Sequence, residues 1–264
     1  MKNLLLAAIS ILLFSCNSSK NAGSDNDVVN KQVEYISNGK KFIGYAAYTK
    51  GTHPLVIIVP EWWGVNDYAK RRANQLAAMG YNAFVADYYG DGMNTTDPQT
   101  AKKWSEPFYK DPAMGKAIFD AALSEAAKIK ENNMEKVAAI GYCFGGAQVL
   151  NVARLGADLK GVVSFHGNLE TGVPTKKELL KAKILVCNGA DDKFISPEEI
   201  ASFKQNMEAI NADMSFKNYP NALHSFTNPD ATAMGKQHNM AIAYNKEADD
   251  ASWKDMQAFF KRIF

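Results

Sequence analysis

Continuous apolar runs alternate along the chain with stretches whose apolar residues recur at helical spacing. Short apolar runs bounded by turn residues are typical of strands buried on both faces of a parallel sheet. We expect such strands at residues 55–59, 83–86, 137–140, 161–165, 184–187 and 214–219. We expect helices at residues 67–79, 112–129, 147–155, 197–210 and 253–263. This alternation predicts an α/β fold with a mostly parallel central sheet and helices on both faces.

Two segments depart from the alternation. Residues 32–36 and 42–48 have alternating apolar and polar side chains and are joined at Asn38-Gly39, which predicts an antiparallel β-hairpin. Residues 90–111 contain two glycines, two prolines and one tryptophan and show no clear period. Long irregular segments in compact domains usually carry function. We therefore expect a lid or a substrate-binding insertion there, with an ordinary surface loop as the alternative.

The length and composition indicate one globular domain. Of the 264 residues, 47% are hydrophobic and 22% are charged, which is enough apolar material for a sizeable core. The 30 basic and 28 acidic residues are dispersed and leave a net charge of +2. Nucleic-acid binding requires a concentrated basic surface. We therefore expect no nucleic-acid partner, and a monomer that binds a small molecule.

The N-terminal residues differ in kind from the rest of the chain. Lys2 precedes an apolar stretch at residues 4–14, which ends at Ser15-Cys16. This order is typical of a secretory signal cut before a cysteine that is then lipidated, and the stretch is too short to favour a membrane span. We expect a signal peptide at residues 1–15, a lipid on Cys16, a flexible tether at 16–31 and the catalytic domain at 32–264. Such a protein is exported and anchored to a membrane, in the periplasm or at the cell surface; plain secretion is the alternative.

The three cysteines cannot form a disulfide framework, so each needs its own explanation. Cys187 ends an apolar run and is expected in the core. Cys143 lies in Gly141-Tyr142-Cys143-Phe144-Gly145, between a predicted strand and a predicted helix. This is the G-x-S-x-G pattern of a nucleophile elbow, with cysteine in place of serine. Because a helix N-terminus favours negative charge, we expect Cys143 to act as a thiolate nucleophile.

Chains with this elbow place an acid and then a histidine after the nucleophile. Asp191 and Asp192 both follow the predicted strand at 184–187, so either can be the acid. Of the four histidines, only His224 lies in a loop past a late strand, between this acid and the closing helix. We expect His224 to be the base. His166 precedes the acid and is expected to line the substrate pocket.

From Pro54 to Phe264 the chain resembles the dienelactone hydrolases, a family of α/β-hydrolases. The resemblance rests on four motifs: EWWGVN at residues 61–66, the cysteine elbow, Gly189-x-x-Asp192 and His224-Ser225-Phe226. It implies hydrolysis of a small ester or lactone. In the family a branched aliphatic residue follows the acid by three positions, and Ile195 selects Asp192 over Asp191 on that basis. The family glutamate at the position of Glu61 contacts the nucleophilic thiol, which implies the same contact with Cys143.

The oxyanion of such a reaction is usually held by the amide after the nucleophile and an amide from the loop after an early strand. These amides belong to Phe144 and Trp62. Cys143 would attack the substrate carbonyl, and His224 would protonate the leaving alkoxide and then activate water against the thioester. No step in this scheme calls for a metal or another cofactor.

The chain departs from the family at its substrate-binding arginines. Dienelactone hydrolases hold an anionic substrate with one arginine after the Asp-x-Tyr strand and another just past the catalytic histidine. Neither neighbourhood contains an arginine here, so dienelactone is not the expected substrate. Trp63, Tyr88 and Tyr89 instead predict an aromatic, less charged pocket.

A different class of function competes with the enzyme. The chain could be a catalytically silent binding lipoprotein that keeps the fold without the activity. The full set of cysteine, aspartate, histidine and glutamate favours the enzyme, because a silent protein has no physical need for all four. A thiol peptidase uses related chemistry and is not separated from an esterase by these motifs.

Overall fold

The computed structural model describes residues 28–264. The expected signal peptide, the lipidation site Cys16 and residues 16–27 of the expected tether lie outside the described residues. Within the described range no helix is both long enough and apolar enough to cross a membrane.

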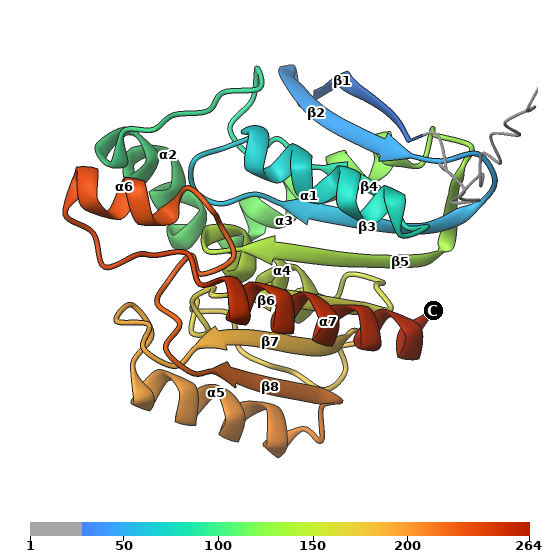
Figure 1. Cartoon of the computed structure of the whole chain (residues 1–264). Coiled ribbons are helices and arrows are strands. Elements are labelled where there is room, and N and C mark those ends of the chain that lie inside the picture. The colour runs from blue at the N-terminus through green and yellow to red at the C-terminus, as the bar shows by residue number, and fades with distance from the viewer. Residues whose placement is uncertain (1–27) are drawn as a thin grey trace, which may run out of the picture.

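Eight strands form one sheet in the order β1-β2-β4-β3-β5-β6-β7-β8 (Figure 1). The strands are β1 (Val29–Ser37), β2 (Lys40–Tyr48), β3 (His53–Val59), β4 (Asn82–Val85), β5 (Asn132–Tyr142), β6 (Gly161–Phe165), β7 (Lys183–Gly189) and β8 (Met214–Tyr219). β2 runs antiparallel to both β1 and β4, and every pairing from β4 to β8 is parallel. This topology confirms the predicted α/β-hydrolase fold with a mostly parallel sheet.

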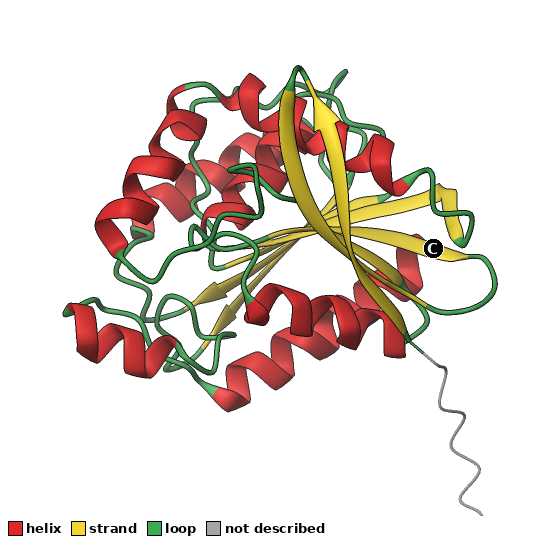
Figure 2. Cartoon of the chain, turned by 90° about the horizontal axis from the view of Figure 1, so that it is seen from above, coloured by secondary structure: helices red, strands yellow, loops and turns green. Residues whose placement is uncertain are grey.

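Helices cover both faces of the sheet (Figure 2). They are α1 (Asp67–Ala78), α2 (Pro98–Lys110), α3 (Pro112–Ala126), α4 (Phe144–Arg154), α5 (Pro197–Ala209), α6 (Ala231–His238) and α7 (Lys246–Ile263). Buried side chains of α3, α4 and α5 form one core with one face of the sheet, whereas α1 and α7 form a second core with the other face.

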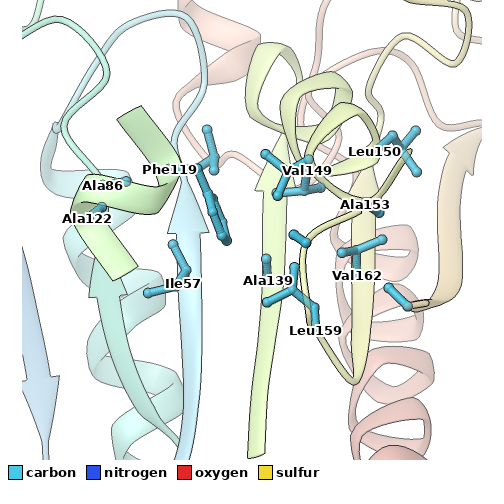
Figure 3. Close-up of a cluster of buried hydrophobic side chains, with 14 of the residues drawn as sticks. Ile57, Ala86, Phe119, Ala122, Ala139, Val149, Leu150, Ala153, Leu159 and Val162 are labelled. Atoms are coloured by element: carbon cyan, nitrogen blue, oxygen red, sulfur yellow. The ribbon is translucent and has the colours of Figure 1, made fainter. Parts of the chain in front are cut away.

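The strands are apolar on both sides because both faces of the sheet are covered. Every residue from Leu55 to Val59 is fully buried, and successive residues belong to opposite cores. Figure 3 shows Phe119 and Ala122 of α3 and Val149 of α4 above Ile57 and Ala139 of the sheet. The continuous apolar runs in the sequence therefore correspond to the central parallel strands.

The predicted hairpin is confirmed, and its turn explains the asparagine and glycine. Asn38 and Gly39 have φ of 49° and 74°, the left-handed values that a tight two-residue turn between antiparallel strands requires. β1 begins at Val29, inside the segment expected to be tether, and pairs with β2 as far as Tyr48.

Residues 90–111 are not irregular throughout, contrary to the sequence-based expectation. They contain α2, whose N-cap Asp97 accepts hydrogen bonds from the backbone N–H groups of Gln99 and Thr100. Pro98 occupies the first turn of the helix, where a missing N–H does no harm, and Pro107 lies inside it. The short helix α6 was also not predicted.

The parallel strands place five chemistry-bearing residues at one edge of the sheet. Glu61, Cys143, His166, Asp192 and His224 each follow the carboxyl end of a strand, from β3, β5, β6, β7 and β8 respectively. These five strands are consecutive neighbours in the sheet. Residues separated by more than 160 positions in the chain are thereby brought to one place.

Candidate active site

Cys143 occupies a sharp bend between β5 and α4. Its φ of 52° and ψ of −117° lie in a region that side chains other than glycine rarely adopt. The bend needs glycine on either side: a Cβ on Gly141 would lie 2.0 Å from the carbonyl oxygen of Gly145, and a Cβ on Gly145 would lie 2.1 Å from that of Val59. The predicted nucleophile elbow is thus present in the backbone geometry.

His224 is hydrogen-bonded to the acid that the spacing argument favoured. Its Nδ1 lies 2.8 Å from Oδ2 of Asp192, whose side chain is fully buried. The other oxygen of Asp192 accepts a hydrogen bond of 2.8 Å from the backbone N–H of Phe194. Asp191 is exposed instead, so the geometry singles out Asp192 as the partner of His224.

The charge state of His224 is set by its neighbours. Burial by itself would lower the pKa of His224, but the Cys143 thiolate and hydrogen bonds with Asp192 and Cys143 raise it well above its ordinary value. The imidazole is therefore protonated when the thiol is ionised. A positive imidazolium between a thiolate and a carboxylate is the arrangement that nucleophilic catalysis by cysteine requires.

The two amides predicted to hold an oxyanion lie close to Cys143. Phe144 is the first residue of α4, and Trp62 follows β3 directly beyond Glu61. Among the hydrogen bonds of residues 28–264, neither amide N–H has an acceptor. The carbonyl of Trp62 accepts a 3.0 Å hydrogen bond from the hydroxyl of Tyr89, which fixes the orientation of this peptide.

Glu61 does not make the expected contact with the Cys143 thiol. Its carboxylate accepts hydrogen bonds from Ser225 Oγ at 3.0 Å and from Asn228 Nδ2 at 2.7 Å. Burial raises the pKa of Glu61, and the hydrogen bonds from Asn228 and Ser225 oppose this rise. The side chain is therefore held beneath the loop that carries His224, and the expectation of direct contact is corrected.

A cavity of about 340 Å³ opens at Cys143 and His224. Its other lining residues are Trp62, Lys102, Ser105, Glu106, Tyr109, Asn168, Phe194, Ser225, Met240 and Ile242. Four of these residues come from α2, so the segment at 90–111 forms part of the cavity wall. The walls are mostly apolar, and Lys102 and Glu106 lie one helical turn apart on α2.

Several lining residues were not identified from the sequence. Phe194 lies beside the acid, and its ring centroid is 4.9 Å from that of His224. Ile242 forms an isolated parallel bridge with His224, which brings a segment just after α6 to the cavity. Proximity to the acid could have pointed to Phe194, but no sequence signal marks Ile242.

Four predicted lining residues do not line this cavity. Trp63 is buried and lines a different pocket beside α1, and Tyr88 and Tyr89 line a separate groove beside α2. The rings of Tyr88 and Tyr89 pack on Phe144, so they support the elbow rather than the substrate. His166 is 1% exposed and lies beneath Cys143. These side chains point into the protein interior, and no pattern in the sequence indicated that direction.

The described part of the chain, residues 28–264, holds no group of three or more His, Cys, Asp or Glu side chains arranged as a metal site.

A sequence model described as the dienelactone hydrolase family matches residues 42–264. A solved structure named m3DLH is 34% identical, covers 90% of this chain and 99% of its own, and superposes with a TM-score of 0.84. A dienelactone hydrolase-like promiscuous phosphotriesterase from metagenomic libraries is 33% identical over 90% of this chain and 99% of its own, with a TM-score of 0.83. A protein of Aquifex aeolicus with the provisional name carboxymethylenebutenolidase is 27% identical over 75% of this chain and 87% of its own length.

Proposed function

Since the chain belongs to the dienelactone hydrolase family, we propose that it hydrolyses small, largely apolar esters or lactones through a thioester on Cys143. One observation carries the proposal: Cys143 on its strained bend shares a cavity with His224, which is hydrogen-bonded to the buried Asp192. The three side chains that such a reaction needs therefore lie together beside a largely apolar cavity.

The first half of the reaction forms the thioester. The Cys143 thiolate attacks the carbonyl carbon, and the amides of Trp62 and Phe144 donate hydrogen bonds to the developing oxyanion. When the tetrahedral intermediate collapses, the C–O bond breaks and the imidazolium of His224 gives its proton to the leaving alkoxide. The raised pKa of His224 supports this role, because the proton must already be on the ring.

The second half regenerates the thiolate. Neutral His224 takes a proton from water, the hydroxide attacks the thioester carbonyl, and the C–S bond breaks. The acid product leaves, and Cys143 and His224 return to thiolate and imidazolium. Asp192 keeps the Nδ1–H of His224 fixed, so that the other ring nitrogen faces the reacting atoms.

The cavity favours substrates with a compact apolar body. Trp62, Phe194 and Ile242 offer apolar contact, whereas Lys102 and Glu106 together contribute no net charge. No arginine of residues 28–264 lines this cavity, and Asn228, four residues past His224, is hydrogen-bonded to Glu61. A neutral aryl or short-chain alkyl ester is therefore a better match than a dianionic lactone.

Hydrolysis of 4-nitrophenyl acetate and butyrate by the purified domain tests the proposal. The wild type should turn over both esters, Cys143→Ala should lose the activity, and His224→Asn should fall by about 10³-fold or more. Intact-mass analysis after rapid acid quench should show an acyl group on wild-type protein but not on Cys143→Ala. Turnover retained in Cys143→Ala would refute the nucleophile, and no hydrolysis of any ester would favour the silent binding protein.

Neutral phosphotriesters are a second candidate class of substrate. The observation that favours them is the 33% identity with a phosphotriesterase of this family, over nearly all of that chain. Here the thiolate would attack phosphorus and expel an aryloxide, and water would then cleave the S–P bond. Steady release of 4-nitrophenol from diethyl 4-nitrophenyl phosphate would support this activity, whereas a single stoichiometric burst would indicate that the phosphorylated cysteine is a dead end.

We also propose that the protein is exported and anchored through lipid on Cys16, on the strength of the N-terminal sequence alone. Metabolic labelling of the full chain with an alkyne fatty acid should mark the wild type and not Cys16→Ala. Label retained in Cys16→Ala would contradict the anchor.

A further inference from the structure

Both ring nitrogens of His166 are hydrogen-bonded to the two segments that carry the reaction. Nδ1 accepts from the backbone N–H of Cys143 at 3.1 Å, a donor that it shares with the carbonyl of Phe165 at 2.9 Å, and Nε2 lies 2.8 Å from Oγ1 of Thr227. Thr227 is three residues beyond His224 in the same loop. One imidazole therefore spans from the nucleophile bend to the loop of the base.

The identity of these partners fixes the proton on the ring. A backbone N–H can only donate, so Nδ1 is bare and accepts from Cys143, and Nε2–H donates to Thr227. Burial lowers the pKa of His166 well below its ordinary value, and the charges of His224 and Arg72 lower it further. Besides His224, the titratable ring nearest to His166 is that of Tyr142, whose centroid lies 6.1 Å away. His166 is thus neutral. A second proton on Nδ1 would face the backbone N–H of Cys143, and two donors cannot form a hydrogen bond.

We propose that His166 is a positioning residue, which holds the Cys143 bend and the His224 loop in one fixed arrangement. The inference rests on the proposed function, since the positioned groups are the nucleophile and base assigned above. The ring itself is well anchored: the backbone N–H of His166 donates to the carbonyl of Cys187 at 2.8 Å, and its ring lies 5.2 Å from that of His224.

Thr227, the hydrogen-bond partner of His166 in the loop of the base, is itself held in place by other residues. Thr227 Oγ1 lies 2.6 Å from the hydroxyl of Tyr68, and the Thr227 carbonyl accepts a 2.7 Å hydrogen bond from Arg72. Both partners belong to α1, and Arg72 forms a buried ion pair with Asp249 of α7. The loop of the base is therefore joined to two helices on one side and to the nucleophile on the other.

His166 has no route to the substrate, which gives the proposal a kinetic signature. The side chain is buried and does not line the cavity at Cys143. Loss of the link should misplace the thiolate relative to the imidazolium, and an error of about 1 Å in such geometry reduces rates by about 10²-fold. We expect the loss in kcat, with little change in KM.

Three substitutions at His166 separate the two hydrogen bonds. His166→Asn retains an acceptor near the position of Nδ1 but is too short to reach Thr227. His166→Gln can reach Thr227 but leaves the Cys143 amide without its side-chain acceptor. His166→Phe removes both bonds and keeps a ring. We expect kcat to fall by about 10²-fold in His166→Phe and by about 10-fold in each of the other two.

Two substitutions at Thr227 test the same hydrogen bond without changing His166. Thr227→Val removes the acceptor for Nε2–H and keeps the shape, whereas Thr227→Ser retains the hydroxyl. We expect Thr227→Val to lose about 10-fold in kcat and Thr227→Ser to recover most of that loss.

The decisive readout needs no substrate. NMR titration of His224 in the free protein should give a lower pKa in His166→Phe than in the wild type, because a displaced imidazole pairs less well with the thiolate. A merely structural role would lower the melting temperature without moving this pKa in the protein that remains folded. Wild-type kcat together with an unshifted His224 titration in folded His166→Phe would overturn the proposal. Ester turnover retained in Cys143→Ala would instead overturn the proposed function, so the two failures are distinguishable.

Discussion

Asp192 and His224 are joined by a 2.8 Å hydrogen bond although they lie 32 residues apart, on loops that follow adjacent strands β7 and β8. The buried carboxylate accepts a hydrogen bond from Nδ1–H of His224, which leaves Nε2 to exchange a proton with the reacting groups. Loss of this hydrogen bond should reduce the rate of catalysis.

Asp192→Asn should lower kcat by about 10³- to 10⁴-fold, because an amide cannot stabilise the imidazolium or hold its tautomer. Asp191→Asn is the matched control at the neighbouring exposed position and should leave kcat within about twofold. Steady-state kinetics on 4-nitrophenyl acetate measures both. Equal losses in the two variants would contradict the assignment of the acid.

Glu61→Gln should change how stability depends on pH. Because burial raises the pKa of Glu61 in the folded state, the folded chain binds more protons than the unfolded chain above about pH 4.3. The free energy of unfolding should therefore fall as pH rises, by about 1.4 kcal/mol per pH unit from this group until its folded-state pKa is passed. Urea unfolding from pH 5 to 8 should show Glu61→Gln gaining on the wild type as pH rises. A stability difference that does not depend on pH would argue against a raised pKa.

Phe194→Ala should weaken substrate binding and leave the fold intact. The side chain lines the cavity, and 46% of its surface is exposed, so its loss removes substrate contact rather than core packing. We expect KM for phenyl esters to rise by about 10-fold and the melting temperature to change little. Phe194→Leu should recover part of the binding. An unchanged KM in Phe194→Ala would place the substrate elsewhere in the cavity.

Gly145→Ala should destabilise the protein through a backbone clash. The new Cβ would lie 2.1 Å from the carbonyl oxygen of Val59 and 2.6 Å from that of Pro60, so helix α4 and strand β3 would have to separate. We expect a loss of about 3 kcal/mol. Gly172→Ala is the control, because its Cβ meets nothing within 4 Å and costs only the strain of a positive φ, about 1 kcal/mol. Chemical denaturation compares the two, and equal losses would show that the close approach is not the cause.

Site residues could be predicted from the sequence where a short motif also has a fixed place in the order of strands. The bend at Cys143 needs glycines at fixed offsets, and the acid and base must follow strands in a set order, so the bend and His224 could be predicted from position. Position left Asp191 and Asp192 both open, and the resemblance to the family selected Asp192, which the structure places beside His224.

Side-chain direction and partners far apart in the chain were harder to predict. Tyr88 and Tyr89 lie three and four residues past the end of β4, yet they pack inward on Phe144. Glu61 finds its partners 164 and 167 residues further on, at Ser225 and Asn228, which no local pattern encodes. Helix α2 was missed for another reason: its prolines suggested an irregular segment, whereas Pro98 serves as a helix start.

The hairpin at the start of the described chain places residue 28 on the side of the domain opposite the cavity. Val29 pairs with Tyr48 beyond the amino end of β4, so the chain enters the domain at the side opposite the carboxyl edge that holds Cys143 (Figure 1). Under the proposed lipid anchor, the domain would be attached on the side opposite the cavity, so the point of attachment would leave access to Cys143 and His224 free.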